Sequence, residues 1–302
     1  MSDYRIGVDL GGTKIEAAAL DASGEIRLRK RAATPTGQYD AILATVADLV
    51  AFLEAELNTR ASVGVATPGA LSLLNGKIKN SNSTVLNGRA FKNDVERKLG
   101  REIRMANDAN CFALSEAVDG AGRGARGVFG VILGTGVGGG IVIDGRIVTG
   151  ANAIAGEWGH NPLPLPDATD HPLPLCYCGR RGCIETYLSG PGLAADFARD
   201  CGERIDAVEI AKRAEEADAQ CAAAMDRYEL RLARAISGVI NVLDPDVIVL
   251  GGGLSNVRRL YSHVPRLCKE FVFSDDIRTR IVAPVHGDSS GVRGAAWPWN
   301  DN

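Results

Sequence analysis

The stretch RIGVDLGGTKIEAAAL at residues 5–20 decides the fold, because it sets a two-glycine turn between two apolar strands. We predict strands at 5–9 and 14–20 around Gly11 and Gly12, with a further turn at 21–24. The same architecture returns in VFGVILGTGVGGGIVI at 128–143, as a strand at 128–133, a glycine turn at 134–140, a strand at 141–143 and a turn at 144–146. Two such hairpins indicate duplicated lobes, although one sequence does not prove duplication.

The rest of the chain agrees with an α/β protein of two lobes. Single hydrophobic cores rarely grow beyond about 250 to 300 residues, and this chain has 302. Apolar spacing predicts a helix at 39–57. Further predicted elements are strands at 63–66, 103–106 and 246–250, helical segments across 192–243, helices at 257–273 and 290–297, and a Pro-rich irregular stretch at 162–174.

Composition narrows the class of protein. The net charge is −3 and no segment gathers Lys and Arg densely, which argues against a nucleic-acid partner. The N-terminus has no signal-peptide pattern, and the sequence has no run of about 18 apolar residues. Three of the seven cysteines crowd into residues 176–183, which suits a reducing compartment with one metal site. We therefore expect a cytoplasmic protein with no membrane partner.

The first glycine turn has the composition of a phosphate site. Gly11 and Gly12 let backbone N–H groups approach phosphate oxygens, and Thr13 and Lys14 add a hydroxyl and a cation. Asp9, at the strand end, is placed to hold Mg²⁺ or its waters. A plain hairpin turn accounts for this motif equally well. Its glycines join two strands, so it is neither a P-loop nor a dinucleotide-binding turn, whose glycines open a helix.

Two more glycine clusters follow predicted strands. The run 134–140 holds five glycines, and their cost in backbone entropy favours close approach of a ligand over a simple turn. Together, the three clusters favour nucleotide binding. The residues we expect to contact ATP are Asp9, Gly11, Gly12, Thr13, Lys14, Gly134, Thr135, Gly136, Gly138, Gly251, Gly252 and Gly253.

Asn107 and Asp108 follow the predicted strand at 103–106. A carboxylate at the carboxyl end of a strand is well placed to accept the proton of a sugar hydroxyl that attacks a γ-phosphate. On position alone, capping of the next helix is the better account of Asp108. The neighbouring motifs reverse that preference.

His160, Cys176, Cys178 and Cys183 supply one imidazole and three thiolates, the ligand set of a closed tetrahedral zinc site. Such a set leaves no open position for water, so we predict structural Zn²⁺ rather than catalytic Zn²⁺. Glu157 and Glu185 lie beside the expected ligands and are candidates to bind a polyol. The alternative for each of them is an ordinary surface carboxylate with no ligand.

With these motifs in place, the chain resembles the ROK family of bacterial sugar kinases, repressors and related proteins. The resemblance runs from Ile6 to Trp297 and rests on DLGGTK (9–14), the Asn107-Asp108 pair, GTGVGGG (134–140), GEWGH (156–160), CYCGRRGCIE (176–185) and LDPDVIVLGGG (243–253). Within the family, SNSTVLNG (81–88) and HGDSSGVRGAAW (286–297), among others, look like the fructokinase, or mannokinase, branch.

The resemblance implies a two-lobed actin-like ATPase, or ribonuclease H-like, fold with ATP and a hexose in the cleft between the lobes. The first lobe would comprise 1–112 plus a C-terminal helix at about 288–302, and the second would comprise 113–287 with the zinc loop 160–183. Asp108 would be the catalytic base, and one nitrogen of His160 would bind zinc while the other faces the sugar. The implied sugar contacts are Gly69, Asn80, Asn82, Asn107, Asp108, Glu157, His160 and Glu185.

The implied reaction is ATP-dependent phosphorylation of fructose to fructose 6-phosphate, with mannose as a second substrate and Mg²⁺ as cofactor. Glucose, N-acetylglucosamine and N-acetylmannosamine stay open as alternatives, and the longer Pro-rich loop weakens a transfer of glucose specificity. The predicted first strand begins at Arg5, so we do not expect the DNA-binding domain of the family's repressors. An actin-like ATPase that is not a kinase and a sugar-sensing protein are the alternatives from other classes. A homodimer is an option, since kinases of the family are often dimers.

Overall fold

The computed structural model describes residues 4–297 and contains two five-stranded sheets of the same design. In each sheet three antiparallel strands are followed by two strands that run parallel to the central one. The first sheet has the order β3 (Ile26–Ala33), β2 (Lys14–Leu20), β1 (Arg5–Leu10), β4 (Ser62–Thr67) and β7 (Arg104–Asn107). The second has the order β10 (Arg146–Ile147), β9 (Val137–Ile143), β8 (Gly127–Leu133), β11 (Val247–Gly251) and β12 (Arg280–Val282). The predicted repeat of the hairpin therefore extends to whole sheets.

The second hairpin differs from its prediction. Leu133 pairs with Val137, so its turn spans only residues 134–136. Gly138, Gly139 and Gly140 belong to β9, where they pair with residues of β8. The predicted turn at 134–140 and the short strand at 141–143 were therefore wrong, because glycine in a strand can serve close packing as well as a turn.

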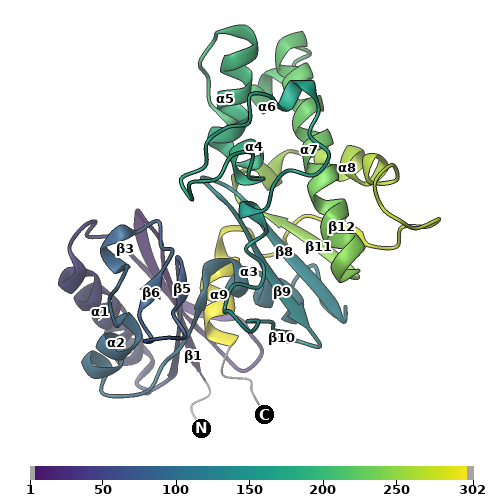
Figure 1. Ribbon diagram of the computed structural model, residues 1–302. Coiled ribbons are helices and arrows are strands. Elements are labelled where there is room, and N and C mark those ends of the chain that lie inside the picture. Colours follow the sequence, from purple (N-terminus) through teal and green to yellow (C-terminus); the bar gives the residue numbers. More distant parts are fainter. Residues whose placement is uncertain (1–3, 298–302) are drawn as a thin grey trace.

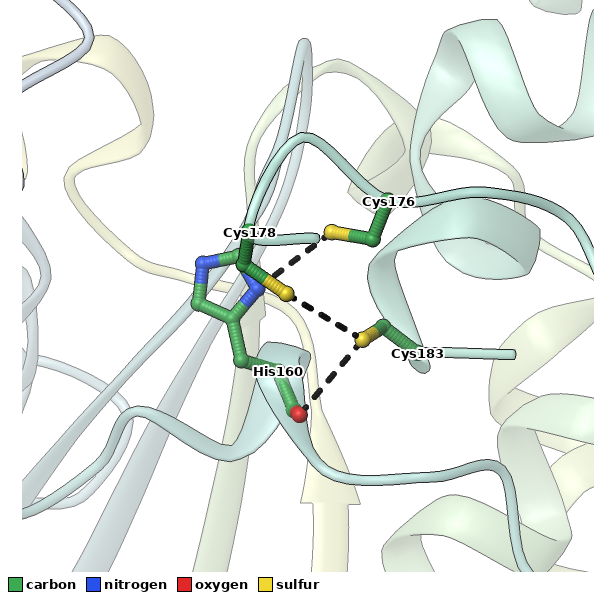
Figure 2. Close-up of side chains that lie close together, drawn as sticks. All are labelled: His160, Cys176, Cys178 and Cys183. Atoms are coloured by element: carbon green, nitrogen blue, oxygen red, sulfur yellow. Dashed lines mark hydrogen bonds between the residues drawn. The ribbon is translucent and has the colours of Figure 1, made fainter. Parts of the chain in front are cut away.

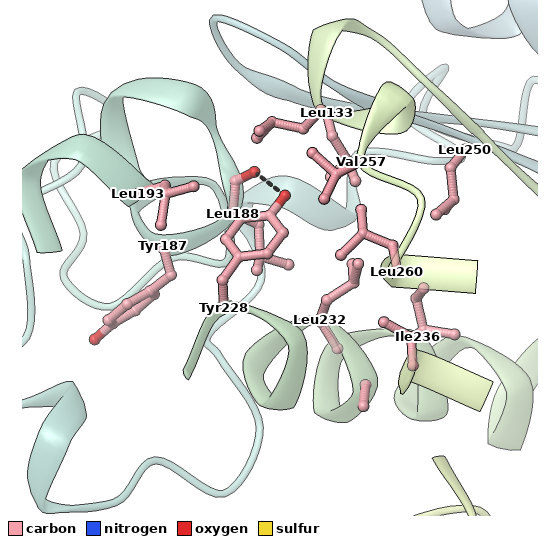
Figure 3. Close-up of a cluster of buried hydrophobic side chains, with 14 of the residues drawn as sticks. Leu133, Tyr187, Leu188, Leu193, Tyr228, Leu232, Ile236, Leu250, Val257 and Leu260 are labelled. Carbon is pink, nitrogen blue, oxygen red and sulfur yellow. Dashed lines mark hydrogen bonds between the residues drawn. The ribbon is translucent and has the colours of Figure 1, made fainter. Parts of the chain in front are cut away.

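Helices cover each sheet and bury its apolar face. In the first lobe, α1 (Tyr39–Leu57) has the predicted bounds and buries Ile42, Val46 and Leu53 against the sheet, beside α2 (Phe91–Leu99). In the second lobe, α7 (Ala219–Leu243) is the longest helix of the core and packs against α5 (Gly190–Cys201), α6 (Ala207–Glu215) and α8 (Leu260–Cys268). Figure 3 shows its Leu232 and Ile236 beside Val257 and Leu260.

Two helices lie between the sheets and connect them (Figure 1). The helix α3 (Asp108–Val118) packs on β8 and β9, whereas α9 (Ser290–Ala296) packs on β1, β2 and β4. A Cβ atom on Gly294 would lie 1.7 Å from the backbone oxygen of Cys111, so the two helices meet backbone to backbone. The expected boundary at 112 falls inside α3. The C-terminal helix returns to the first sheet, and residues 298–302 of that expected segment lie outside the described residues.

The remaining elements are short, and several differ from prediction. The helix predicted at 257–273 is reduced to α8 (Leu260–Cys268), and the helical region predicted at 192–243 is divided into three helices. Strand β3 and helix α2 were not predicted, because four of the eight side chains of β3 and six of the nine of α2 are polar. Among residues 4–297, no helix has the length and apolarity needed to cross a bilayer. The other elements are β5 (Ala70–Leu71), β6 (Ile78–Lys79), η1 (Thr84–Leu86), η2 (Trp158–His160), η3 (Ala168–Asp170), α4 (Glu185–Leu188), α5 (Gly190–Cys201), α6 (Ala207–Glu215), η4 (Gly253–Asn256) and η5 (Gly287–Ser289).

Candidate active site and metal centre

Asn107 and Asp108 lie where β7 ends and α3 begins, and they divide two roles. The Asn107 side chain is the N-cap, because its Oδ1 accepts hydrogen bonds from the backbone N–H of Ala109 at 2.9 Å and of Asn110 at 3.4 Å. Its Nδ2 donates to the backbone oxygen of Gly69 at 3.2 Å, which joins α3 to the loop after β4. Asp108 is the first helical residue, and its Oδ1 accepts from Ala109 N–H at 2.8 Å. The helix cap therefore does not account for Asp108.

A second carboxylate, Asp9, lies close enough to Asp108 for the charge of Asp108 to raise the pKa of Asp9. Burial raises the pKa of Asp9 to about 7, and the negative charges of Asp108 and Glu16 add to the effect. Burial also raises the pKa of Asp108, with the charge of Glu157 contributing. The site thus gathers acidic groups that are harder to ionise than free carboxyls, as is common at functional sites.

A cavity of about 750 Å³ lies between the two sheets beside these residues. Three of the predicted sugar contacts line it, namely Gly69, Asn107 and Glu157. Asn80 and Asn82 are exposed and lie outside its lining, as do Asp108, His160 and Glu185. Other polar groups on its wall are Arg104, Asn110, Asp144, Arg146 and Thr149. Sequence reasoning did not assign these residues to the site, because they come from β7, α3, β10 and the neighbouring loops and share no motif.

The predicted phosphate turns differ in how open they are. A Cβ atom on Gly12 or on Gly253 would meet no atom within 4 Å, so these two positions face open space. A Cβ on Gly140 would instead lie 2.4 Å from the backbone oxygen of Ala109, and one on Gly251 would lie 2.5 Å from the ring of Phe112. Packing against α3 therefore accounts for Gly140 and Gly251 without a ligand.

Two residues of the second lobe hold the turn at 134–136, which belongs to the same lobe. Glu185 Oε2 accepts a hydrogen bond from Val137 N–H at 3.0 Å, and Gly190 N–H donates to the backbone oxygen of Gly134 at 2.8 Å. Glu185 thus contacts the glycine turn as well as lying next to the cysteine loop. Gly190 was missed, although the sequence SGPG at 189–192 combines an N-cap serine with a proline at the helix start.

The structure brings His160, Cys176, Cys178 and Cys183 together (Figure 2), with all four donor atoms within 4.8 Å of one another. Cys178 Sγ lies 3.6 Å from Cys183 Sγ, and Cys176 Sγ lies 3.6 Å from His160 Nδ1. Ligands bound at the usual zinc distances are about 3.5 to 3.8 Å apart at the edges of a tetrahedron. Because the donor set and the spacing both fit, this cluster is a candidate zinc site.

His160 makes one contact that was not foreseen. Its Nδ1 faces the thiols, but its Nε2 lies 2.9 Å from the hydroxyl oxygen of Tyr177. Tyr177 is 77% exposed, and its ring meets the imidazole edge to face, with ring centroids 5.1 Å apart. The only available signal was an aromatic residue set between two expected zinc ligands.

The Pro-rich stretch before the cysteines is anchored by buried ion pairs. Asp170 is fully buried and accepts hydrogen bonds from Arg231 Nε at 2.7 Å and from Arg234 Nη1 at 3.0 Å, both on α7. Asp167 also pairs with Arg234, at 2.5 Å. Sequence reasoning missed this network, because charged residues more than 60 positions apart give no local pattern.

The sequence and fold of this chain are similar to those of known proteins. The family model described as "ROK family" matches residues 5–302, nearly the whole chain. This chain belongs to the ROK family. The expected resemblance to ROK sugar kinases is thereby confirmed, together with the two-lobed actin-like ATPase fold.

The proteins similar to this chain include a kinase matched by sequence and two ROK kinases of known structure. The N-acetyl-D-glucosamine kinase of Photobacterium profundum is 40% identical over 296 residues, which cover 96% of this chain and 97% of that protein. A ROK hexokinase from Thermus thermophilus superposes with a TM-score of 0.86 at 27% identity, covering 97% of this chain and 96% of the other. A ROK glucokinase from Streptomyces griseus, solved with glucose and AMPPNP, gives 0.79 at 26% identity and covers 97% and 98%. The fructokinase branch that we expected is not confirmed by these ROK relatives.

Proposed function

We propose that this protein is an ATP-dependent sugar kinase whose substrate is N-acetyl-D-glucosamine. The main support for kinase activity is the position of the Asp108 carboxyl group, directly after β7, beside the cavity and close to Asp9. Asn107 caps the helix, so Asp108 is not needed for that role. The choice of sugar rests on the 40% identity to an N-acetyl-D-glucosamine kinase over nearly the whole chain. This choice replaces fructose as the first candidate.

In the proposed reaction, Asp108 is the general base. A sugar hydroxyl oxygen forms a bond to the γ-phosphorus of ATP, the bond from that phosphorus to the ADP oxygen breaks, and the hydroxyl proton passes to Asp108. Burial raises the pKa of Asp108, which favours the protonated form that the transfer produces. Gly69, Asn107 and Glu157, on the cavity wall, would hold the sugar so that its hydroxyl faces Asp108.

For the nucleotide, we propose the two open glycine positions as the points of closest approach. Gly12 at the β1–β2 turn and Gly253 after β11 leave room for phosphate or ribose against the backbone. Thr13 and Lys14 are exposed beside Gly12, and Lys14 Nζ lies 3.7 Å from Glu16. The turn 134–136, fixed by Glu185 and Gly190, would cradle the phosphates from the other lobe.

Asp9 is the residue that we propose to hold Mg²⁺. Its partly buried carboxylate lies near Asp108 and Glu16, and oxygen ligands of this kind suit the ion. When bound, Mg²⁺ would neutralise phosphate charge. A bound cation would lower the pKa of Asp9, which burial raises to about 7, and would therefore favour its ionised form.

For the metal centre, we propose one structural zinc ion bound by His160, Cys176, Cys178 and Cys183. Cys176 and Cys183 are buried, and Gly179 and Gly182 have φ of 86° and 72°, so the loop can wrap tightly around an ion. Replacing Cys178 with Ser should lower the bound zinc, measured by mass spectrometry of metals, from about one ion per chain to well below half. Cys201→Ser, in α5, is the matched control and should keep its zinc. Equal zinc in both variants would remove the proposed site.

The test of the kinase is the rate of ADP formation with Mg²⁺ across N-acetylglucosamine, N-acetylmannosamine, glucose, fructose and mannose. We expect the highest kcat/KM for N-acetylglucosamine. Asp108→Asn should keep sugar and ATP binding but lower kcat by about 10² to 10⁴-fold, whereas Asp276→Asn, at an exposed position, should not change it. A preference for fructose would restore the fructokinase reading, and wild-type turnover by Asp108→Asn would remove Asp108 as the base.

A further inference from the structure

Tyr177 lies within the cysteine loop, and its side chain contacts His160, one of the four candidate zinc ligands. Its hydroxyl oxygen is 2.9 Å from His160 Nε2, and the two rings meet at 84° with centroids 5.1 Å apart. Because the side chain is 77% exposed, it can rotate away from His160 without leaving a cavity. The contact is therefore one that a ligand can replace at low cost.

The orientation of His160 leaves one ring nitrogen for both Tyr177 and a sugar. Nδ1 faces Cys176 Sγ at 3.6 Å and so belongs to the candidate zinc site. A neutral imidazole that binds a metal through Nδ1 carries its proton on Nε2 and donates one hydrogen bond from there. With that tautomer the acceptor would be the Tyr177 hydroxyl oxygen, which lies 2.9 Å from Nε2.

We propose that Tyr177 is a positioning residue that occupies the sugar-facing nitrogen of His160 until the sugar displaces it. This inference rests on the proposed function and on the sugar contact that the resemblance to ROK sugar kinases implies for His160. Before substrate binds, Tyr177 keeps the imidazole oriented and its Nε2–H hydrogen-bonded. A sugar hydroxyl then takes over the bond, so Tyr177 lowers the apparent affinity for sugar in return for an ordered site.

The test compares Tyr177→Phe with the wild-type enzyme. The variant keeps the ring and loses the competing hydroxyl, so KM for N-acetylglucosamine should fall about two- to tenfold, the range expected for one hydrogen bond. We expect kcat, KM for ATP and zinc content to stay within twofold. Tyr39→Phe is the matched control, because its hydroxyl donates to Asp94 Oδ2 at 2.6 Å in the first lobe, away from His160. It should leave the KM for sugar unchanged.

A second readout does not depend on turnover. The chain has four histidines, so the ¹⁵N resonances of His160 can be assigned by substitution. In the zinc-loaded protein the Nε2–H signal should shift between wild type and Tyr177→Phe without sugar, and the two should converge when the sugar is saturating.

The outcomes separate the two proposals. An unchanged or raised KM for sugar in Tyr177→Phe, with an active wild type, would overturn the role of Tyr177. Spectra that stay different at saturation would also overturn it. Absence of sugar turnover by the wild-type protein would instead contradict the proposed function, and the spectra without sugar would still show whether Tyr177 occupies Nε2.

Discussion

The β1–β2 hairpin and the β8–β9 hairpin share one sequence signature but use their glycines differently. In the first, Gly12 is exposed in the turn and faces open space. In the second, Gly138, Gly139 and Gly140 lie in the strand, where the backbone of α3 and the loop at 156–158 pack against them. A glycine cluster between two strands therefore indicates that other atoms approach the backbone closely. Those atoms can belong to a ligand or to another segment of the same chain.

The first lobe has its own packing glycine, but it lies elsewhere. A Cβ atom on Gly7, in β1, would lie 1.9 Å from the backbone oxygen of Val292 in α9. Each sheet thus uses glycine to let one interlobe helix approach it, α9 on the first sheet and α3 on the second. The packing glycine lies in β1 in the first sheet and in β9 in the second. The two sheets therefore share their topology but not the positions of their glycines.

The largest effect expected from this comparison is that of Gly140→Ala. Its Cβ would lie 2.4 Å from Ala109 O and 2.8 Å from the Ala109 carbonyl carbon, and backbone atoms in a helix cannot move away easily. We expect a loss of about 3 kcal/mol in the free energy of unfolding, measured by urea denaturation. Gly253→Ala is the control, with less than about 1 kcal/mol expected. A stable Gly140→Ala protein would contradict packing as the reason for the second cluster.

An intermediate effect is expected at Asp9, at the end of β1. Its raised pKa means that the folded protein binds a proton that the unfolded chain has released between about pH 4 and 7. The resulting stabilisation is complete below about pH 4 and is lost as the pH rises through about 7.

Asp9→Asn should therefore be more stable than wild type by about 1 to 3 kcal/mol at pH 8 without nucleotide or Mg²⁺, and the gain should shrink towards pH 4. Denaturant unfolding at several pH values measures it. Asp276→Asn, an exposed aspartate, should show no such pH-dependent gain. A constant difference between Asp9→Asn and wild type across this range would contradict the raised pKa.

The smallest effect on stability is expected for Gly12→Ala. The new Cβ meets no atom within 4 Å, and the backbone there lies outside the left-handed region. We expect a change below about 1 kcal/mol in stability but a rise of about tenfold in KM for ATP, because a methyl group would separate the backbone from phosphate. Unchanged KM for ATP would favour the plain hairpin as the account of this turn.

Short-range patterns were enough to predict much of the molecule. The bounds of α1 and the strands β1, β2 and β8 follow from apolar spacing within one element, to within a residue or so. His160 and the three cysteines were recognisable because metal ligands are restricted to few residue types and the cysteines lie close in sequence. The sequence was enough to place Asp108 at the end of a strand. It was not enough to predict that Asn107, and not Asp108, caps the following helix.

Contacts between segments far apart in the sequence were decided by the tertiary structure alone. The Asn107 amide reaches the backbone oxygen of Gly69, and buried Asp170 is paired with two arginines of α7. Tyr177 meets His160 only when the cysteine loop folds back. The packing role of Gly140 depends on α3 lying against β9. Local sequence determined the elements and the donor atoms of this protein, whereas the partners of those atoms were decided by chain segments that no local pattern connects.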